Sequence, residues 1–206
     1  MIKNISLAFG AAVVLASCAT PASAPSREET MQVVKASFKD RGIAKTDRLN
    51  QTDLQQVCSD ASLTGRELPK DVRERLEKQQ MATIKYPADG KFLGDFKLGE
   101  RIAQTGVGLQ WSDNEKTVNG GNCYACHELS PAEISYGNIG PSLKGYGKLR
   151  GRSDAVVKYT WGKIWNTHAF NACSSMPRFG DAGILTEEQV KHVMALLLDP
   201  ASPVNK

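Results

Sequence analysis

Cys123-Tyr124-Ala125-Cys126-His127 is the segment around which the rest of this 206-residue chain can be interpreted. Two cysteines three positions apart, with a histidine directly after the second, form the attachment pattern of a c-type haem. Each thiol can form a thioether bond with one haem vinyl group, and the imidazole is then held against the iron as its proximal ligand. The segment therefore predicts one haem c, bound covalently through Cys123 and Cys126, with His127 as an axial ligand.

A bare C-x-x-C pair also occurs in thioredoxin-type redox centres and as half of a zinc site. We favour haem because the chain has no second C-x-x-C, no later histidine pair at zinc-finger spacing and no alternating strand–helix pattern around the motif. A single attachment motif and only three histidines also argue against several haems.

The composition is that of a globular chain with a mild positive charge. Apolar residues make up 41% of the sequence, and the formal net charge is +4. The chain has no basic run and no stripe in which basic and aromatic residues alternate, so nucleic-acid binding is not expected.

Residues 1–24 are expected to be a signal sequence that exports the protein to the periplasm. The apolar stretch over residues 5–16 is too short for a transmembrane helix. Two processing sites compete. Residues 15–18 (LASC) resemble a lipobox, in which Cys18 would be acylated, and residues 22–24 (ASA) resemble an ordinary cleavage site. The lipobox is favoured because Pro25 would follow the ordinary cut, and association with the membrane is expected only through this lipid anchor.

After the leader, apolar residues recur at helical spacing and no strong strand pattern is present, so we predict an all-α protein. Residues 25–89 are expected to form an N-terminal helical extension, and residues 90–206 a monohaem domain. The glycines of Asn119-Gly120-Gly121 are expected to give the backbone freedom to turn into the attachment motif. The expected helices cover residues 28–40, 53–61, 71–84, 95–104 and 154–167, followed by a last helix with a capping box of Thr186 and Gln189.

The sixth iron ligand must come from elsewhere in the chain, and the candidates are Met81, His168, Met176, His192 and Met194. Met194 lies on the apolar face of the last helix, so packing in the core explains its presence. His192 lies on the polar face of that helix, so it is expected to be a solvent-exposed histidine. Met176 stands in a polar loop without periodicity, where a methionine has no packing role, so we favour it over His168. Haem with a His/Met ligand pair has a higher reduction potential than bis-His haem, which suits an electron acceptor.

Further residues are expected around the haem. The carbonyl of Pro141 is a candidate acceptor for the other ring nitrogen of His127, an interaction that fixes the tautomer of a ligating histidine. Several apolar side chains are candidates either for the haem pocket or for an ordinary helical core: Leu143, Tyr146, Trp161, Trp165 and Phe179.

Two cysteines remain once Cys18 and the motif are set aside. Cys58 and Cys173 form an even pair in an oxidising compartment, which predicts a disulfide. Because Cys173 stands three residues before Met176, this bridge would connect the extension to the proposed ligand loop and limit the movement of that loop.

Several separate segments between Gly90 and Asn205 resemble the SoxX family, the monohaem cytochrome subunits of the SoxAX complexes of bacterial sulfur oxidation. The segments are the attachment motif and residues 134–152, 158–165, 176–180 and 183–186. The resemblance implies a class I cytochrome c domain, with haem attached at Cys123 and Cys126 and with His127 and Met176 as axial ligands. It supports neither the extension nor the Cys58–Cys173 pair.

The resemblance also implies a role. A SoxA cytochrome subunit would be the partner in a heterodimer that acts as an L-cysteine S-thiosulfotransferase, coupling thiosulfate oxidatively to a cysteine of the SoxYZ carrier. The bond-forming chemistry would take place on SoxA, while this chain would accept the electrons and pass them to a soluble cytochrome c. The alternative is a free-standing diffusible monohaem cytochrome c electron carrier, because both functions need the same haem ligands.

Overall fold

The computed structural model describes residues 25–206, and over this range the chain forms helices and loops without a β-strand. The prediction of an all-α protein is therefore confirmed. The predicted signal sequence and Cys18 lie outside the described residues. The α-helices are α1 (Arg27–Ser37), α2 (Asp53–Thr64), α3 (Lys70–Met81), α4 (Phe96–Gln104), α5 (Tyr146–Arg150), α6 (Asp154–Trp165) and α7 (Glu187–Leu198). The short 3-10 turns are η1 (Thr46–Leu49), η2 (Cys123–Ala125), η3 (Thr167–Ala169) and η4 (Pro203–Asn205).

Polar caps start most of the predicted helices. The capping box predicted for α7 is confirmed: the Gln189 amide donates to Thr186 Oγ1 over 3.2 Å, and the Thr186 amide donates to Gln189 Oε1 over 3.0 Å. Thr52 and Gln55 make the same reciprocal pair at the start of α2. Helix α5 was not predicted, because its five residues are too few to show a helical repeat.

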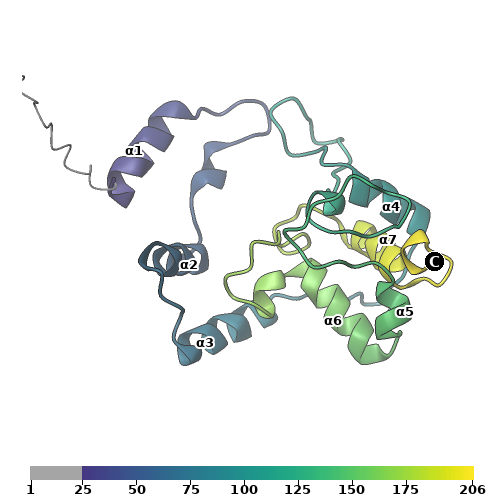
Figure 1. Cartoon of the computed structure of the whole chain (residues 1–206). Coiled ribbons are helices and arrows are strands. Elements are labelled where there is room, and N and C mark those ends of the chain that lie inside the picture. Colours follow the sequence, from purple (N-terminus) through teal and green to yellow (C-terminus); the bar gives the residue numbers. More distant parts are fainter. Residues whose placement is uncertain (1–24) are drawn as a thin grey trace, which may run out of the picture. The chain divides into compact units, whose positions relative to one another are not determined.

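The chain divides into two packing units, one ending at Phe38 and one formed by residues 39–206. Helix α1 belongs to the first unit and buries none of its residues. In the second unit, α2 and α3 are part of the same body as the helices that follow residue 90 (Figure 1). The second unit therefore begins well before the boundary that the sequence suggests between residues 89 and 90.

The main core of the second unit lies where α4 and α6 pack against α7. Helix α7 is buried along most of its length, and Met194 is fully buried in it, as its apolar position predicts. On α6, the rings of Trp161 and Trp165 stack with centroids 5.7 Å apart.

Helices α4 and α7 approach most closely at Gly99. A Cβ atom added there would overlap the carbonyl oxygen of His192 and lie 3.0 Å from Cβ of Leu196. His192 itself connects the two helices, because its Nδ1 accepts a hydrogen bond from the amide of Asp95, the N-cap residue of α4 (2.9 Å). The prediction that His192 is a solvent-exposed histidine is therefore wrong, since only 15% of its side chain is exposed.

A Gly99→Ala variant is expected to be less stable than the wild type by about 1–3 kcal/mol, because the two helices must move apart to fit the added methyl group. Urea unfolding followed by circular dichroism measures the change. Lys97→Ala is the matched control, since Lys97 lies exposed on the same helix. Equal stability of the Gly99 variant and the control would show that the helix crossing is not tight at this point.

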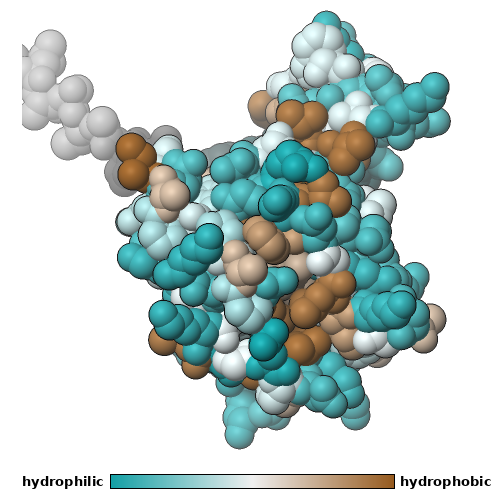
Figure 2. All heavy atoms as spheres, turned by 90° about the vertical axis from the view of Figure 1, so that its right-hand side faces the viewer, coloured by the Kyte–Doolittle hydropathy of each residue, from teal (hydrophilic) through white to brown (hydrophobic). Residues whose placement is uncertain are grey.

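Within residues 25–206, no helix is both long enough and apolar enough to cross a membrane. On the face drawn in Figure 2, hydrophilic side chains surround separate groups of apolar ones. Scattered apolar groups of this kind are ordinary on the surface of a folded protein.

Candidate haem site

The attachment motif lies on a tight turn that is anchored to the end of α4. The amide of Gly121 donates to the Ile102 carbonyl and the amide of Asn122 to the Thr105 carbonyl, both over 2.8 Å. The turn η2 then folds back on itself, so that the His127 amide donates to the Cys123 carbonyl over 2.9 Å. The two motif cysteines, neither of which forms a disulfide within the described residues, therefore lie on either side of a single turn of chain.

The backbone freedom for this turn is supplied differently from our expectation. Asn122 adopts the left-handed conformation, with φ of 46°, whereas Gly120 and Gly121 do not. Gly120 is needed for a different reason, because a Cβ atom on it would overlap the carbonyl oxygen of Thr105. An asparagine tolerates the left-handed region better than most residues, which explains its place directly before the first cysteine.

The ring of His127 is held in one orientation by the loop that follows it. Nδ1 lies 2.7 Å from the Pro141 carbonyl oxygen, and since a carbonyl can only accept, Nδ1 must carry the proton. The expected partner of His127 is therefore confirmed. The lone pair of the neutral ring is left on Nε2, the atom that a metal would need.

Glycine packing and backbone hydrogen bonds fasten the same loop to the motif. A Cβ atom on Gly140 would overlap the imidazole ring of His127, so the loop lies flat against it. The amides of Gly137, Gly140 and Leu143 donate to the carbonyls of Tyr124, Cys126 and Glu128, each over 2.8 Å. This loop positions His127 through its backbone.

The electrostatics of the motif do not resemble those of a reactive cysteine pair. Burial raises the pKa of the Cys123 thiol to about 12, and the neighbouring Cys126 and Glu100 contribute in the same direction. Redox-active and nucleophilic cysteines have lowered pKa values, because the thiolate is the reactive form. The direction of this shift at Cys123 is opposite to the one that a nucleophilic thiol requires.

A buried pair that the sequence did not reveal lies beside the first cysteine. Tyr124 donates its hydroxyl to Glu100 Oε1 over 2.8 Å, and the amide of Ser130 donates to the Tyr124 hydroxyl over 3.2 Å. Burial raises the pKa of Glu100, and it also raises that of Tyr124. Glu100 stands on α4, so the pair adds a side-chain link between the motif and the helix that anchors it. The pairing had no sequence signal, because the two residues lie 24 positions apart.

The segment that carries Met176 packs on the same core as the motif. Met176 and Cys123 are both partly buried against the cluster formed by α4, α6 and α7. Farther along, the amides of Phe179 and Gly180 donate to the last carbonyls of α6, those of Ile164 and Trp165, over 3.2 Å. Met176 also lines a groove of about 470 Å³ between α2 and residues 172–178.

The remaining candidate ligands have other surroundings. His168 is buried, and its Nε2 lies 3.1 Å from the Ser174 carbonyl oxygen. His192 is hydrogen-bonded between α4 and α7, and Met194 is packed in the core. Met81 is 41% exposed at the end of α3. Of the five candidates, Met176 is therefore the one that lies on a loop against the core without another evident task.

The predicted disulfide is confirmed. Cys58 on α2 is bonded to Cys173, with an S–S distance of 2.05 Å and a Cα–Cα distance of 5.4 Å. Around it, a second apolar cluster brings together Leu54 of α2, Leu76 of α3 and Ala172. The extension is thus joined to the segment that leads into Met176 both covalently and by packing.

The core also contains a buried donor without a partner. Trp165 Nε1 forms no hydrogen bond among the described residues, whereas the neighbouring Trp161 donates its Nε1 proton to the Lys85 carbonyl over 2.7 Å. An unpaired buried donor is costly, so such a group calls for an acceptor. Haem carries two propionate groups, and a carboxylate oxygen near Trp165 would satisfy the indole N–H. This unpaired indole N–H is one feature of the described residues that suits the group that the motif implies.

Taken together, the fold and the site define an all-α protein with a C-x-x-C-H turn, an oriented histidine and a disulfide-linked helical extension. No protein-family model matches the chain. The chain is 37% identical over 193 residues to an uncharacterized lipoprotein of Aquifex aeolicus (strain VF5), an alignment that covers 90% of this chain and 91% of the relative. This protein belongs to the same family as that lipoprotein.

Proposed function

We propose that the protein is an exported c-type cytochrome that transfers electrons. The observation that carries the proposal is the hydrogen bond of His127 to the Pro141 carbonyl inside a C-x-x-C-H turn, because it leaves Nε2 as the free ring atom. A histidine whose second nitrogen is held by a backbone carbonyl is the usual arrangement of a metal ligand. Residues 90–206 would form the class I cytochrome c domain.

Each residue of the site has a distinct task in this proposal. Cys123 and Cys126 would hold haem c covalently, and His127 and Met176 would be the axial ligands. Bound haem would supply a one-electron redox couple. The buried core around Trp165 would keep water away from the group, and the indole N–H would orient one propionate.

Within this class, we favour a role as the electron-accepting subunit of a SoxAX-type L-cysteine S-thiosulfotransferase. SoxA would be the partner subunit, the SoxYZ carrier the substrate of the complex, and a soluble cytochrome c the next acceptor. The similarity to a lipoprotein counts against the alternative function, a diffusible electron carrier. If Cys18 is acylated as in a lipoprotein, the protein is tethered to a membrane in the periplasm and works at a fixed place, which disfavours free diffusion.

The test is to produce the full chain in a bacterium with haem-attachment machinery and to weigh the mature protein under denaturing conditions. We expect the mass of the polypeptide plus one haem, together with an acyl modification at Cys18, and a pyridine haemochrome spectrum of the c type. A mass that matches the amino acids alone would refute the cytochrome. Purification from the native organism, with the mass of each co-purifying chain, then separates a SoxA-bound subunit from a solitary carrier.

A Met176→His variant is expected to retain covalent haem and to have a lower reduction potential, because bis-His ligation stabilises ferric iron. Potentiometric titration of the purified protein measures the shift. Met81→His is the matched control, since Met81 is exposed at the end of α3, and its potential should equal that of the wild type. An unchanged potential in the Met176 variant would exclude Met176 as the ligand and leave His168 as the next candidate.

A further inference from the structure

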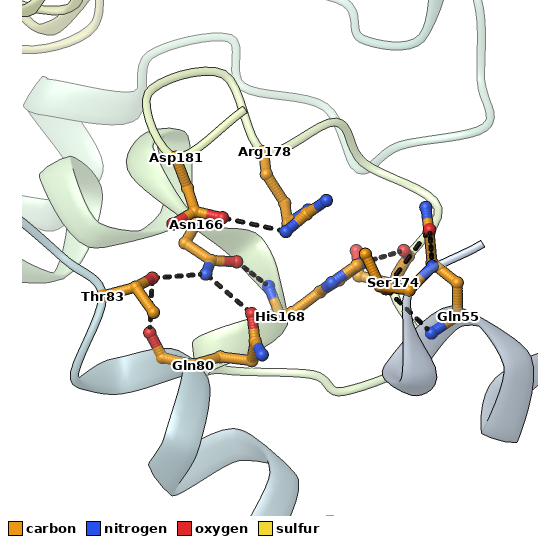
Figure 3. A network of polar contacts seen from close by, with 9 residues as sticks. Gln55, Gln80, Thr83, Asn166, His168, Ser174, Arg178 and Asp181 are labelled. Carbon is orange, nitrogen blue, oxygen red and sulfur yellow. Dashed lines mark hydrogen bonds and ion pairs between the residues drawn. The ribbon is translucent and has the colours of Figure 1, made fainter. Parts of the chain in front are cut away.

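Residues 171–176, which lead to and include Met176, contain a turn but belong to no helix or strand. A ligand on such a segment depends on its neighbours for its position. A continuous chain of hydrogen bonds, drawn in Figure 3, runs from the end of α3 to this segment through five residues: Gln80, Thr83, Asn166, His168 and Ser174. The inference below rests on the proposed function, because it concerns the ligand Met176.

Ser174 is the point at which the connection reaches Met176. Its Oγ accepts a hydrogen bond from the amide of Met176 over 3.2 Å and another from the hydroxyl of Thr167 over 3.1 Å. Its carbonyl oxygen accepts from Nε2 of His168 over 3.1 Å. Ser174 therefore holds the backbone of Met176, and Thr167 and His168 of η3 hold Ser174.

His168 is suited to this task because its ring is enclosed. Only 6% of the residue is exposed, and burial lowers the pKa of its imidazole. The hydrogen bond to the Ser174 carbonyl opposes this lowering of the pKa, as does Asp181, while Arg178 lowers the pKa further. Because a carbonyl oxygen faces Nε2 and can only accept a hydrogen bond, Nε2 carries a proton.

Asn166 connects His168 to the extension. It is fully buried, and its Oδ1 accepts the amide proton of His168 over 3.1 Å. Its Nδ2 donates to Gln80 Oε1 over 3.0 Å and to Thr83 Oγ1 over 2.9 Å, at the end of α3. Figure 3 shows Asn166 lying between this end of α3 and His168. A second contact supports the same bend, because the amide of Ala172 donates to Glu77 Oε1 of α3 over 3.2 Å.

We propose that His168 is a positioning residue for Met176, and that Asn166 and α3 provide the support on which it acts. On this proposal, α3 of the helical extension helps to hold the thioether of Met176, which lies on an irregular loop, in a position to bind the haem iron. Residues behind a metal ligand that fix its orientation typically change metal binding by about 10- to 100-fold when they are replaced. We expect an effect of that size on the equilibrium between bound and detached Met176.

The test compares matched pairs of variants of the full haem-loaded chain. His168→Phe removes the donor and keeps a planar ring, whereas His168→Gln keeps an N–H group at a similar reach. Ser174→Ala removes the acceptor of the Met176 amide. Ser175→Ala is its control, because Ser175 is exposed and lies between Ser174 and Met176 in the sequence. The long-wavelength absorption band of a methionine–ferric haem reports ligation. The reduction potential and the far-UV circular dichroism are measured on the same samples.

If the proposal is right, His168→Phe and Ser174→Ala lose the ligation band at a lower denaturant concentration than the wild type, with an equilibrium for methionine binding weakened about 10- to 100-fold. Their helical signal persists beyond that point, and their reduction potential is lower. His168→Gln and Ser175→Ala stay close to the wild type. Should His168→Phe fail to fold, the comparison of Ser174→Ala with Ser175→Ala gives the same answer.

Two results would overturn the proposal. One is an unchanged ligation midpoint in both His168→Phe and Ser174→Ala. The other is a loss of ligation that coincides with global unfolding in every variant, since His168 would then act on stability alone. Failure of the proposed function gives a different result: the wild type itself would then carry no haem, or carry haem without the methionine band.

Discussion

Replacing both Cys123 and Cys126 with serine is expected to abolish covalent attachment of haem, the largest effect that we predict for any substitution in this chain. A hydroxyl does not form the thioether bond, so haem would separate from the variant under denaturing conditions. The wild type should keep its haem under the same conditions. Mass spectrometry of the denatured polypeptide and absorbance after acid extraction measure the difference directly.

The second cysteine pair provides the control for this experiment. Cys58→Ser/Cys173→Ser replaces the same number of cysteines at another place in the structure, and we expect that variant to keep its haem. Equal haem content in both double variants would contradict attachment at Cys123 and Cys126. Single replacements at the motif should give intermediate results, because one thioether bond would remain.

The Cys58→Ser/Cys173→Ser variant is expected to be less stable than the wild type. The bridge closes a loop with a sequence separation of 115, and it restricts the unfolded chain accordingly. The loop-entropy relation gives a loss of about 4–5 kcal/mol for a loop of this size. Urea unfolding of the variant, compared with the wild type in the presence and absence of a reductant, measures this loss.

The same variant also tests how the bridge affects the ligand. Because Cys173 leads into the bend that ends at Met176, the midpoint for detachment of the methionine should fall in the variant. The reduced wild type should behave like the double variant. An unchanged midpoint in both would show that the bridge stabilises the fold without restraining the ligand loop.

The disulfide and the polar connection through His168 reach the same bend from two helices. The bridge comes from α2, and the hydrogen bonds of Asn166 come from the end of α3. Because Cys173 and Ser174 are adjacent, the two restraints act on the same bend, and a double-mutant comparison measures the coupling between them. On our proposal, α2 and α3 are the part of the extension that supports the ligand loop.

Some of this protein could be predicted from the sequence because the signals are local. The C-x-x-C-H motif lies within five consecutive residues, and the capping box of α7 needs only Thr186 and Gln189. The disulfide followed from counting, since two cysteines remained after the motif and the leader. The helices followed from apolar residues at a spacing of three and four, which places them on one face.

Only the tertiary structure showed which side chains meet across long separations. Asn166 forms hydrogen bonds with Gln80 and Thr83, at sequence separations of 86 and 83. His192 forms one with the amide of Asp95, at a separation of 97. No periodicity or spacing reports such a pairing, because a hydrogen bond between distant residues depends on how helices pack. For this reason the sequence alone predicted the C-x-x-C-H motif and all of the α-helices except α5. Packing decided that the His168 ring meets the Ser174 carbonyl and that α2 and α3 belong to the same body as the motif.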